Sequence, residues 1–265
     1  MMKEFGILLF GHTRPLFIAD VLMSLEKQDA LKYVNVWIDG HQGDKYIKIK
    51  TDQVYNVVKN FNVENIYKHQ GNIGFRKMML QALSVAIKQY DKIMILEDDC
   101  FPTRDAVHIF NEELDNIKNN SEIFSIYGHP FLMGEKNGIC TRFQGWGWGT
   151  TSEKMKPILK QLIDCYSRTE FDYINYVNSV LTDDIIKRID ITPPRLPTKT
   201  LRNYFAWDET TSLLTALAGM VHKPTNPRTI YNFGVSTDSS RFYDISAFEK
   251  PPYNMVAHEN IWDYF

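Results

Sequence analysis

The chain has 265 residues, of which 44% are hydrophobic and 13% aromatic, and this composition excludes an intrinsically disordered protein. Its 30 basic and 32 acidic residues give a formal net charge of -2, which leaves no excess of positive charge for binding a nucleic-acid backbone. The apolar stretch near the N-terminus, Ile7–Phe10, is too short for a signal peptide or a membrane span, and three cysteines without metal-binding spacing fit a reducing compartment. We therefore expect a cytoplasmic protein without a transmembrane segment, and contact with the inner face of a membrane stays open.

Short apolar runs alternate with amphipathic stretches in the first half of the chain. Apolar side chains that recur at helical spacing, such as Ile18, Val21, Leu22 and Leu25, predict helices, and a further helix is expected over 46–58. Strands separated by helices of this length indicate βαβ units, so we predict an α/β fold with a mainly parallel sheet. The predicted strands are Ile7–Phe10, Val34–Ile38, Asn65–Tyr67, Lys92–Leu96 and Ile123–Tyr127.

The second half of the chain is less regular. A segment rich in glycine and tryptophan covers 144–151, and a proline-rich connector, Thr192–Pro197, is incompatible with regular structure. Helices are predicted near Ser152–Ile163, Phe171–Arg188 and Trp207–Leu217, and two short strands follow. Because no repeat or low-complexity linker divides the chain, we predict a single domain over residues 1–265.

Three adjacent acids, Glu97, Asp98 and Asp99, directly follow the apolar strand Lys92–Leu96. In open α/β sheets, ligands bind at the carboxyl ends of the strands. Adjacent carboxylates repel one another by on the order of 1 kcal/mol per pair, and a divalent cation such as Mg²⁺ or Mn²⁺, which prefers oxygen ligands, removes that cost. The pattern therefore favours a metal-nucleotide site over its alternative, a solvated acidic loop before the next helix.

At these acids the chain resembles the family-2-like GT-A glycosyltransferases, in the form of N-acetylglucosaminyltransferase I and related bacterial sugar transferases. The resemblance implies a GT-A fold, and it covers roughly residues 5 to 243. It departs from the family where a histidine is often found, because this chain has Thr237, Asp238 and Ser239 there. The similar segments, in chain order, are Gly11–Pro15, Asp39–Gly40, Asn72–Lys77, Ile95–Asp99, Gln144–Thr150, Ala206–Glu209 and Thr229–Phe242.

The resemblance implies a donor site built on the acids. Asp99 would bind Mn²⁺ or Mg²⁺ directly, with Asp98 as a second candidate ligand, while Glu97 and Asp98 would hold the ribose or the base. From the residues alone, Arg14 and Arg76 fit surface arginines equally well, and Asp39 also fits a simple Asp-Gly turn. The further nucleotide contacts implied are His12, Arg14, Asp39, Asn72 and Arg76.

The part of the chain after about residue 100 is the expected acceptor half, and residues 1–100 are the nucleotide-binding half. Trp146 and Trp148 lie among glycines that allow close backbone approach, so their rings either stack on a sugar or belong to the core. The resemblance makes Asp208 the general base, at a helix start where the dipole favours an anion. Glu209 is the second choice and a candidate substrate contact.

These assignments predict a metal-dependent glycosyltransferase that moves a sugar from a nucleotide-sugar donor, UDP-linked, to a glycan or glycolipid acceptor. One identifiable base and no second nucleophile favour inversion by single displacement. Two alternatives stay open. One is a sugar-nucleotide pyrophosphorylase, although its glycine-rich loop would be longer than Gly11–Pro15, and the other is a non-catalytic carbohydrate-binding protein.

Overall fold

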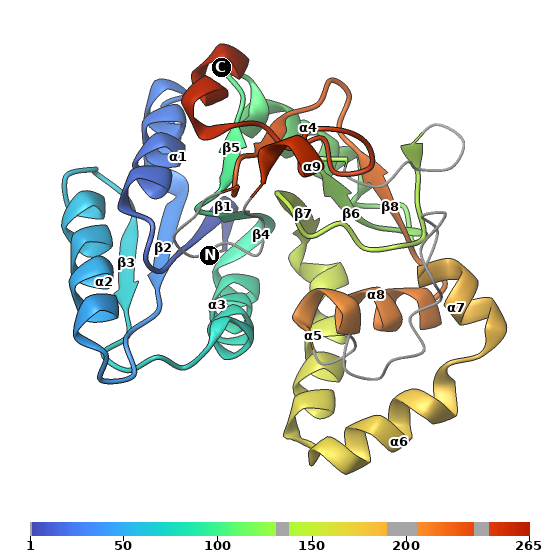
Figure 1. Ribbon diagram of the computed structural model, residues 1–265. Helices are drawn as coiled ribbons and strands as arrows, with labels where there is room; N and C mark the ends of the chain where they lie inside the picture. Colours follow the sequence, from blue (N-terminus) through green and yellow to red (C-terminus); the bar gives the residue numbers. More distant parts are fainter. Residues whose placement is uncertain (1, 131–137, 190–205, 236–243) are drawn as a thin grey trace.

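A computed structural model describes residues 2–130, 138–189, 206–235 and 244–265 (Figure 1). Within these residues, seven strands form one sheet in the order β3-β2-β1-β4-β7-β6-β8. The sheet is mixed but mainly parallel, because only β7 runs antiparallel to its neighbours, β4 and β6. The strands are β1 (Lys3–Gly11), β2 (Val34–Ile38), β3 (Asn65–Lys68), β4 (Tyr90–Glu97), β6 (Ile123–Tyr127), β7 (Trp148–Thr151) and β8 (Val221–Pro224). A small second sheet pairs β5 (Cys100–Pro102) with β9 (Ile230–Asn232).

Helices cover both faces of the large sheet, which is why its strands are apolar on both sides. Successive residues of β1 alternate between two cores, with Ile7 and Leu9 facing one and Leu8 and Phe10 facing the other. The first core is completed by α1 (Pro15–Lys27), α2 (Lys45–Val58) and α4 (Ala106–Ile117). The second is completed by α3 (Phe75–Gln89), α5 (Ser152–Ser167), α6 (Glu170–Val180), α7 (Asp183–Ile189) and α8 (Trp207–Leu217).

The elements predicted in the first half are confirmed to within a few residues, although β5 was not among them, and in the second half two differences concern the elements near the site. The single helix expected over Phe171–Arg188 is two helices, α6 and α7. The chain breaks at Thr182, whose hydroxyl accepts a hydrogen bond from the Ile185 amide at 3.3 Å and so starts α7. Strand β7 was not expected. Its Gly149 allows the strand to approach β4 closely, because a Cβ atom at this position would lie only 3.0 Å from the Ile93 carbonyl oxygen. The connector Thr192–Pro197 lies outside the described residues.

The described end of the chain contains α9 (Ile245–Phe248) and a 3₁₀ helix, His258–Tyr264, and the 3₁₀ helix lies against α1 and β5 (Figure 1). Asp20 of α1 holds this helix through the His258 Nε2 atom at 2.6 Å and the Trp262 indole N–H at 2.7 Å. The Trp262 ring also meets Phe101 of β5 edge-on, with ring centroids 5.1 Å apart. No helix in the described part of the chain has both the length and the apolar character needed to cross a bilayer.

Candidate functional site

The order of strands creates a switch point between β1 and β4. From β1 the chain builds outward through β2 to β3, and it then returns to the other side of β1 to form β4. Phe10 of β1 pairs in register with Glu97 of β4, so the carboxyl ends of the two strands lie side by side. This position is where open α/β sheets bind ligands. It brings the loop that contains Arg14 next to the predicted acids.

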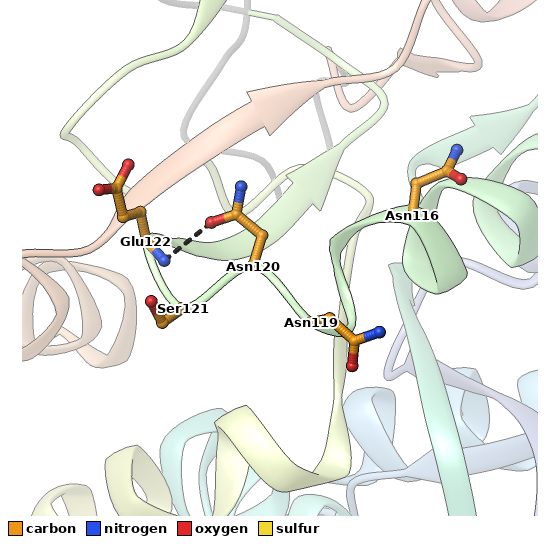
Figure 2. Close-up of a pocket in the computed structure, with 5 residues that line it drawn as sticks. All are labelled: Asn116, Asn119, Asn120, Ser121 and Glu122. Atoms are coloured by element: carbon orange, nitrogen blue, oxygen red, sulfur yellow. Dashed lines mark hydrogen bonds between the residues drawn. The ribbon is translucent and has the colours of Figure 1, made fainter.

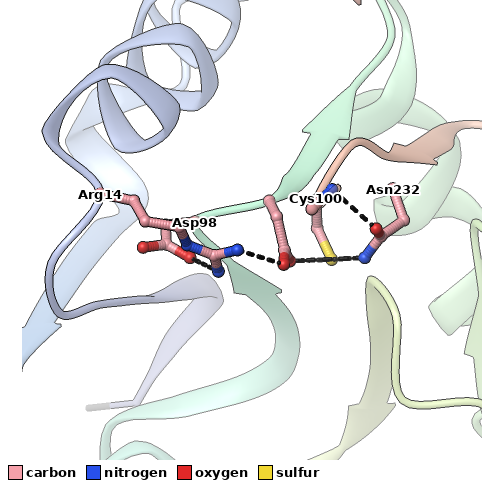
Figure 3. A network of polar contacts seen from close by, with 6 residues as sticks. Arg14, Asp98, Cys100 and Asn232 are labelled. Carbon is pink, nitrogen blue, oxygen red and sulfur yellow. Dashed lines mark hydrogen bonds and ion pairs between the residues drawn. The ribbon is translucent and has the colours of Figure 1, made fainter. Parts of the chain in front are cut away.

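Arg14 holds two of the three acids (Figure 3). Its guanidinium forms an ion pair with Asp98, and its Nη1 atom lies 2.9 Å from Asp99 Oδ2. The Arg14 side chain is 18% exposed, and its guanidinium also lies over the Phe17 ring, 5.1 Å from the centroid. Although burial opposes its charge, Asp98 and Asp99 raise the pKa of Arg14, which therefore stays cationic. In this structure Arg14 orients the acidic cluster.

One guanidinium does not balance three carboxylates. Burial raises the pKa of Glu97 well above its usual value, and the charges of Asp99, Asp98 and Asp208 raise it further. Burial also raises the pKa of Asp98, against the opposing effect of Arg14. Burial is the largest cause of both shifts, and a cation bound beside these carboxylates would favour their charged forms.

Asp99 is enclosed from the side of β9 by Asn232 and Gly234. The Asn232 side-chain amide donates to Asp99 Oδ1 at 3.4 Å, and the Asn232 Oδ1 atom accepts from the Gly234 amide at 3.0 Å (Figure 3). A Cβ atom at position 234 would overlap Asp99 Oδ2, so any larger residue there requires the Asp99 carboxylate to move. Sequence reasoning did not single out Asn232, because nothing in its local pattern shows that β9 pairs beside the acids.

Asp39, at the end of β2, organises the loop before α3. Its carboxylate accepts the backbone amides of Ile73 at 2.9 Å and Gly74 at 3.0 Å, as well as that of Gly40 at 2.8 Å. Gly74 has a φ of 81°, a left-handed conformation that glycine adopts without strain. Asp39 is only 4% exposed, so its visible role is to fix this loop.

His12 and Asn72, also predicted as nucleotide contacts, meet beside Asp39. The His12 Nε2 atom lies 3.1 Å from the Gly40 carbonyl and 3.4 Å from the Asn72 side-chain nitrogen. The structure therefore brings His12, Asp39 and Asn72 together at the carboxyl ends of β1 and β2.

Arg76 and Asp208 approach the same region from two helix starts. Arg76, in the first turn of α3, lies over the Tyr166 ring with its guanidinium carbon 4.5 Å from the centroid. Asp208, in the first turn of α8, is close enough to contribute to the raised pKa of Glu97 after burial and the two aspartates. The predicted base therefore lies within electrostatic range of Glu97. Sequence reasoning missed Tyr166, whose ring lies under Arg76 and whose pKa is also affected by Asp208.

Two residues predicted to touch substrate are enclosed by protein instead. Trp148 is 0% exposed, with the Phe143 ring edge-on at 4.8 Å, so it belongs to the core and does not present a face to a sugar. Glu209 is 8% exposed and forms a buried ion pair with Arg142. Trp146 remains half-buried, edge-on to His129 at 5.2 Å.

The metal expected from the sequence is compatible with these residues. No group of three or more His, Cys, Asp and Glu side chains among the described residues is arranged as a metal site. Magnesium and manganese sites in nucleotide enzymes do not need such a group, because one or two carboxylates act together with substrate phosphates. Asp98 and Asp99 offer adjacent carboxylate oxygens, so the chemistry of the donor set fits a divalent cation.

A shallow hollow elsewhere on the molecule is not the candidate site (Figure 2). It is formed by the polar loop between α4 and β6, where the Glu122 amide donates to the Asn120 side chain at 2.9 Å. The loop precedes β6, which runs in the same direction as β4. The hollow therefore lies at the amino ends of these strands, whereas the acids lie at the carboxyl end of β4. Its lining residues are Asn116, Asn119, Asn120, Ser121 and Glu122.

Comparison with known proteins supports the fold assignment alone. No protein-family model matches the sequence, and no curated protein shows significant sequence similarity to it. The mannosyltransferase PcManGT from Pyrobaculum calidifontis, in complex with GDP-Man and Mn²⁺, superimposes with a TM-score of 0.50 at 12% identity, over 92% of this chain and 59% of that one. S. aureus TarS 1-349 gives a TM-score of 0.45 at 13% identity, over 87% of this chain and 60% of that one.

The chain thus spans about three fifths of the length of these two solved structures. At such low identity the likeness concerns the fold alone. The protein has a GT-A-like α/β fold, as predicted, with a mixed, mainly parallel seven-stranded sheet flanked by helices among its described residues.

Proposed function

We propose that the protein is a glycosyltransferase that moves a sugar from a nucleotide-sugar donor, UDP-linked, to a glycan or glycolipid acceptor. One observation carries the proposal: three adjacent carboxylates, two of them paired with Arg14, lie at the β1–β4 switch point, close enough to Asp208 on α8 for their charges to interact. The likeness to PcManGT supports it, since that protein has this fold and its structure contains GDP-Man and Mn²⁺.

On the donor side, Asp99 and Asp98 would hold Mn²⁺ or Mg²⁺, which when bound neutralises negative charge on the leaving diphosphate. Arg14 keeps both carboxylates oriented through its ion pairs. Glu97 would accept a hydrogen bond from the ribose or the base. The remaining nucleotide contacts come from His12, Asn72 and Arg76, and Asp39 contributes by fixing the loop that carries Asn72.

On the acceptor side, Asp208 is the general base. It accepts the proton of an acceptor hydroxyl while that oxygen forms a bond to the anomeric carbon and the bond from this carbon to the diphosphate oxygen breaks. A single displacement of this kind inverts the anomeric centre. Asp208 suits the role better than Glu209, because Arg142 already pairs with Glu209 inside the protein. The half-buried Trp146 ring is the candidate sugar contact.

A transfer assay tests this function. The protein is incubated with nucleotide sugars, Mn²⁺ and a panel of glycan acceptors, and products are identified by mass spectrometry. Loss of a positioned base typically lowers the rate by about 10²–10⁴-fold, which we expect for Asp208→Asn. Asp184→Asn is the matched control, because Asp184 is an exposed acid in the first turn of α7. Absence of transfer from every donor would refute the function, and full activity of Asp208→Asn would refute the role of Asp208.

A further inference from the structure

Tyr166 connects the end of α5 to the beginning of α8. Its hydroxyl donates to Thr210 Oγ1 at 2.8 Å and lies 3.2 Å from the Ala206 carbonyl. Ala206 is the N-cap of α8, and its carbonyl also accepts the Thr210 amide at 3.0 Å, the first hydrogen bond of the helix. Tyr166 therefore contacts both ends of the helical turn that contains Asp208.

The first turn of α8 receives no side-chain hydrogen bond from its own N-cap residue, although the Thr210 hydroxyl donates to the Ala206 carbonyl at 3.0 Å. An N-cap residue usually fixes the first turn through a side-chain oxygen, and alanine has none. Helix ends without a cap fray. Since Asp208 is the second residue of α8, fraying of this turn would move its carboxylate.

Tyr166 also faces the nucleotide-binding half. The Arg76 guanidinium, from the first turn of α3, lies over its ring at 4.5 Å. Burial raises the pKa of Tyr166, and Asp208 adds to the shift, so the hydroxyl keeps its proton and remains a donor. One side chain thus joins the starts of two helices that carry predicted site residues on opposite sides of the site.

We propose that Tyr166 is a positioning residue, which holds the first turn of α8 so that Asp208 faces the reacting hydroxyl. This assignment rests on the proposed function, because it gives Tyr166 its effect through the general base. Tyr166 touches α8 and Arg76, and it does not itself take part in the transfer of the sugar.

The test compares Tyr166→Phe with Tyr173→Phe. Tyr166→Phe keeps the ring under Arg76 but removes the hydroxyl. Tyr173 is the matched control, because its hydroxyl also lies 2.8 Å from Thr210 Oγ1 but comes from α6. Displacement of a reacting group by about 1 Å costs up to roughly 100-fold in rate, so we expect Tyr166→Phe to lower kcat by about 10- to 100-fold with the donor KM unchanged. Hydrogen exchange of the amides of residues 209–211 should accelerate in the same variant.

The possible outcomes distinguish failure of the positioning role from failure of the proposed function. A lower kcat with faster exchange in Tyr166→Phe, and near wild-type kcat in Tyr173→Phe, supports the positioning role. Unchanged kcat in Tyr166→Phe, or equal losses in both variants, overturns that role while leaving the transferase function in place. Absence of transfer by the wild-type protein overturns the proposed function and the role of Tyr166 together.

Discussion

Two buried histidines make the stability of this protein depend on pH. His129 and His222 are both 0% exposed, and burial lowers the pKa of each from 6.5 to about 3, with smaller effects from Arg228 and Arg188 respectively. The hydrogen bonds of His129 require its neutral form. Its Nδ1 atom accepts from the Asn232 amide at 2.9 Å, and its Nε2 atom donates to the Tyr253 carbonyl at 2.7 Å.

The sign and size of the effect follow from these pKa values. Above pH 6.5 both histidines are neutral whether the protein is folded or not, and their contribution to stability is complete. As the pH falls from about 6.5 to about 3, the two histidines bind protons in the unfolded chain but not in the folded protein. The unfolded state is stabilised in this way, and the contribution of the histidines to the stability of the fold is lost. At 1.36 kcal/mol per pKa unit, each histidine loses about 2 kcal/mol of stabilisation between pH 7 and pH 5.

Urea unfolding at pH 7 and pH 5 measures this contribution when His222→Gln is compared with the wild type. We expect the wild type to lose about 2 kcal/mol more than the variant over this interval, because the variant lacks one buried imidazole. His108→Gln is the matched control, since the His108 side chain is 72% exposed and burial is the cause of the effect. Equal pH dependence in the wild type and His222→Gln would refute the reasoning.

Two further substitutions test the surroundings of the site. Glu209→Ala leaves the buried Arg142 without its carboxylate partner, although Arg142 still donates to the Ile189 carbonyl, and should lower the free energy of unfolding by about 3–5 kcal/mol. A loss below about 1 kcal/mol in urea unfolding would contradict a buried ion pair. Gly234→Ala places a Cβ against the Asp99 carboxylate, so we expect Mn²⁺-dependent nucleotide binding, measured by calorimetry, to weaken by at least about 10-fold, equivalent to about 1.4 kcal/mol. Unchanged affinity would show that Asp99 does not depend on that close approach.

The fold was predictable where the chain repeats simple patterns. The strands Val34–Ile38 and Ile123–Tyr127 have the predicted bounds, because each is an apolar run flanked by turn or polar residues. The break between α6 and α7 was missed, because it contains neither glycine nor proline and depends on the side chain of Thr182. Strand β7 was missed for the opposite reason, since its glycine suggests a loop and its place in the sheet depends on contact with β4.

The site was predictable for residues that directly follow strands, because the carboxyl ends of parallel strands meet at one edge. That reasoning placed the acids near Arg14, and the structure pairs them. It did not distinguish Trp146 from Trp148, although alternate residues of a strand share a face. Gly147, with a φ of 67°, turns the chain between them, so that Trp148 enters the core and Trp146 remains half-buried. Tyr166 was missed because its contacts join helices far apart in sequence.

The nucleotide site itself is tested most directly by thermal unfolding with nucleoside diphosphates, each with and without Mn²⁺. A ligand present at about 100 times its dissociation constant adds roughly 2.7 kcal/mol to the stability, which is readily measured. We predict stabilisation by UDP together with Mn²⁺, its loss in Asp99→Ala, and its retention in Asp91→Ala, which changes an exposed acid near the opposite end of β4. No stabilisation by any nucleoside diphosphate with any metal, or equal stabilisation of Asp99→Ala, would contradict a metal-nucleotide site at the carboxyl end of β4.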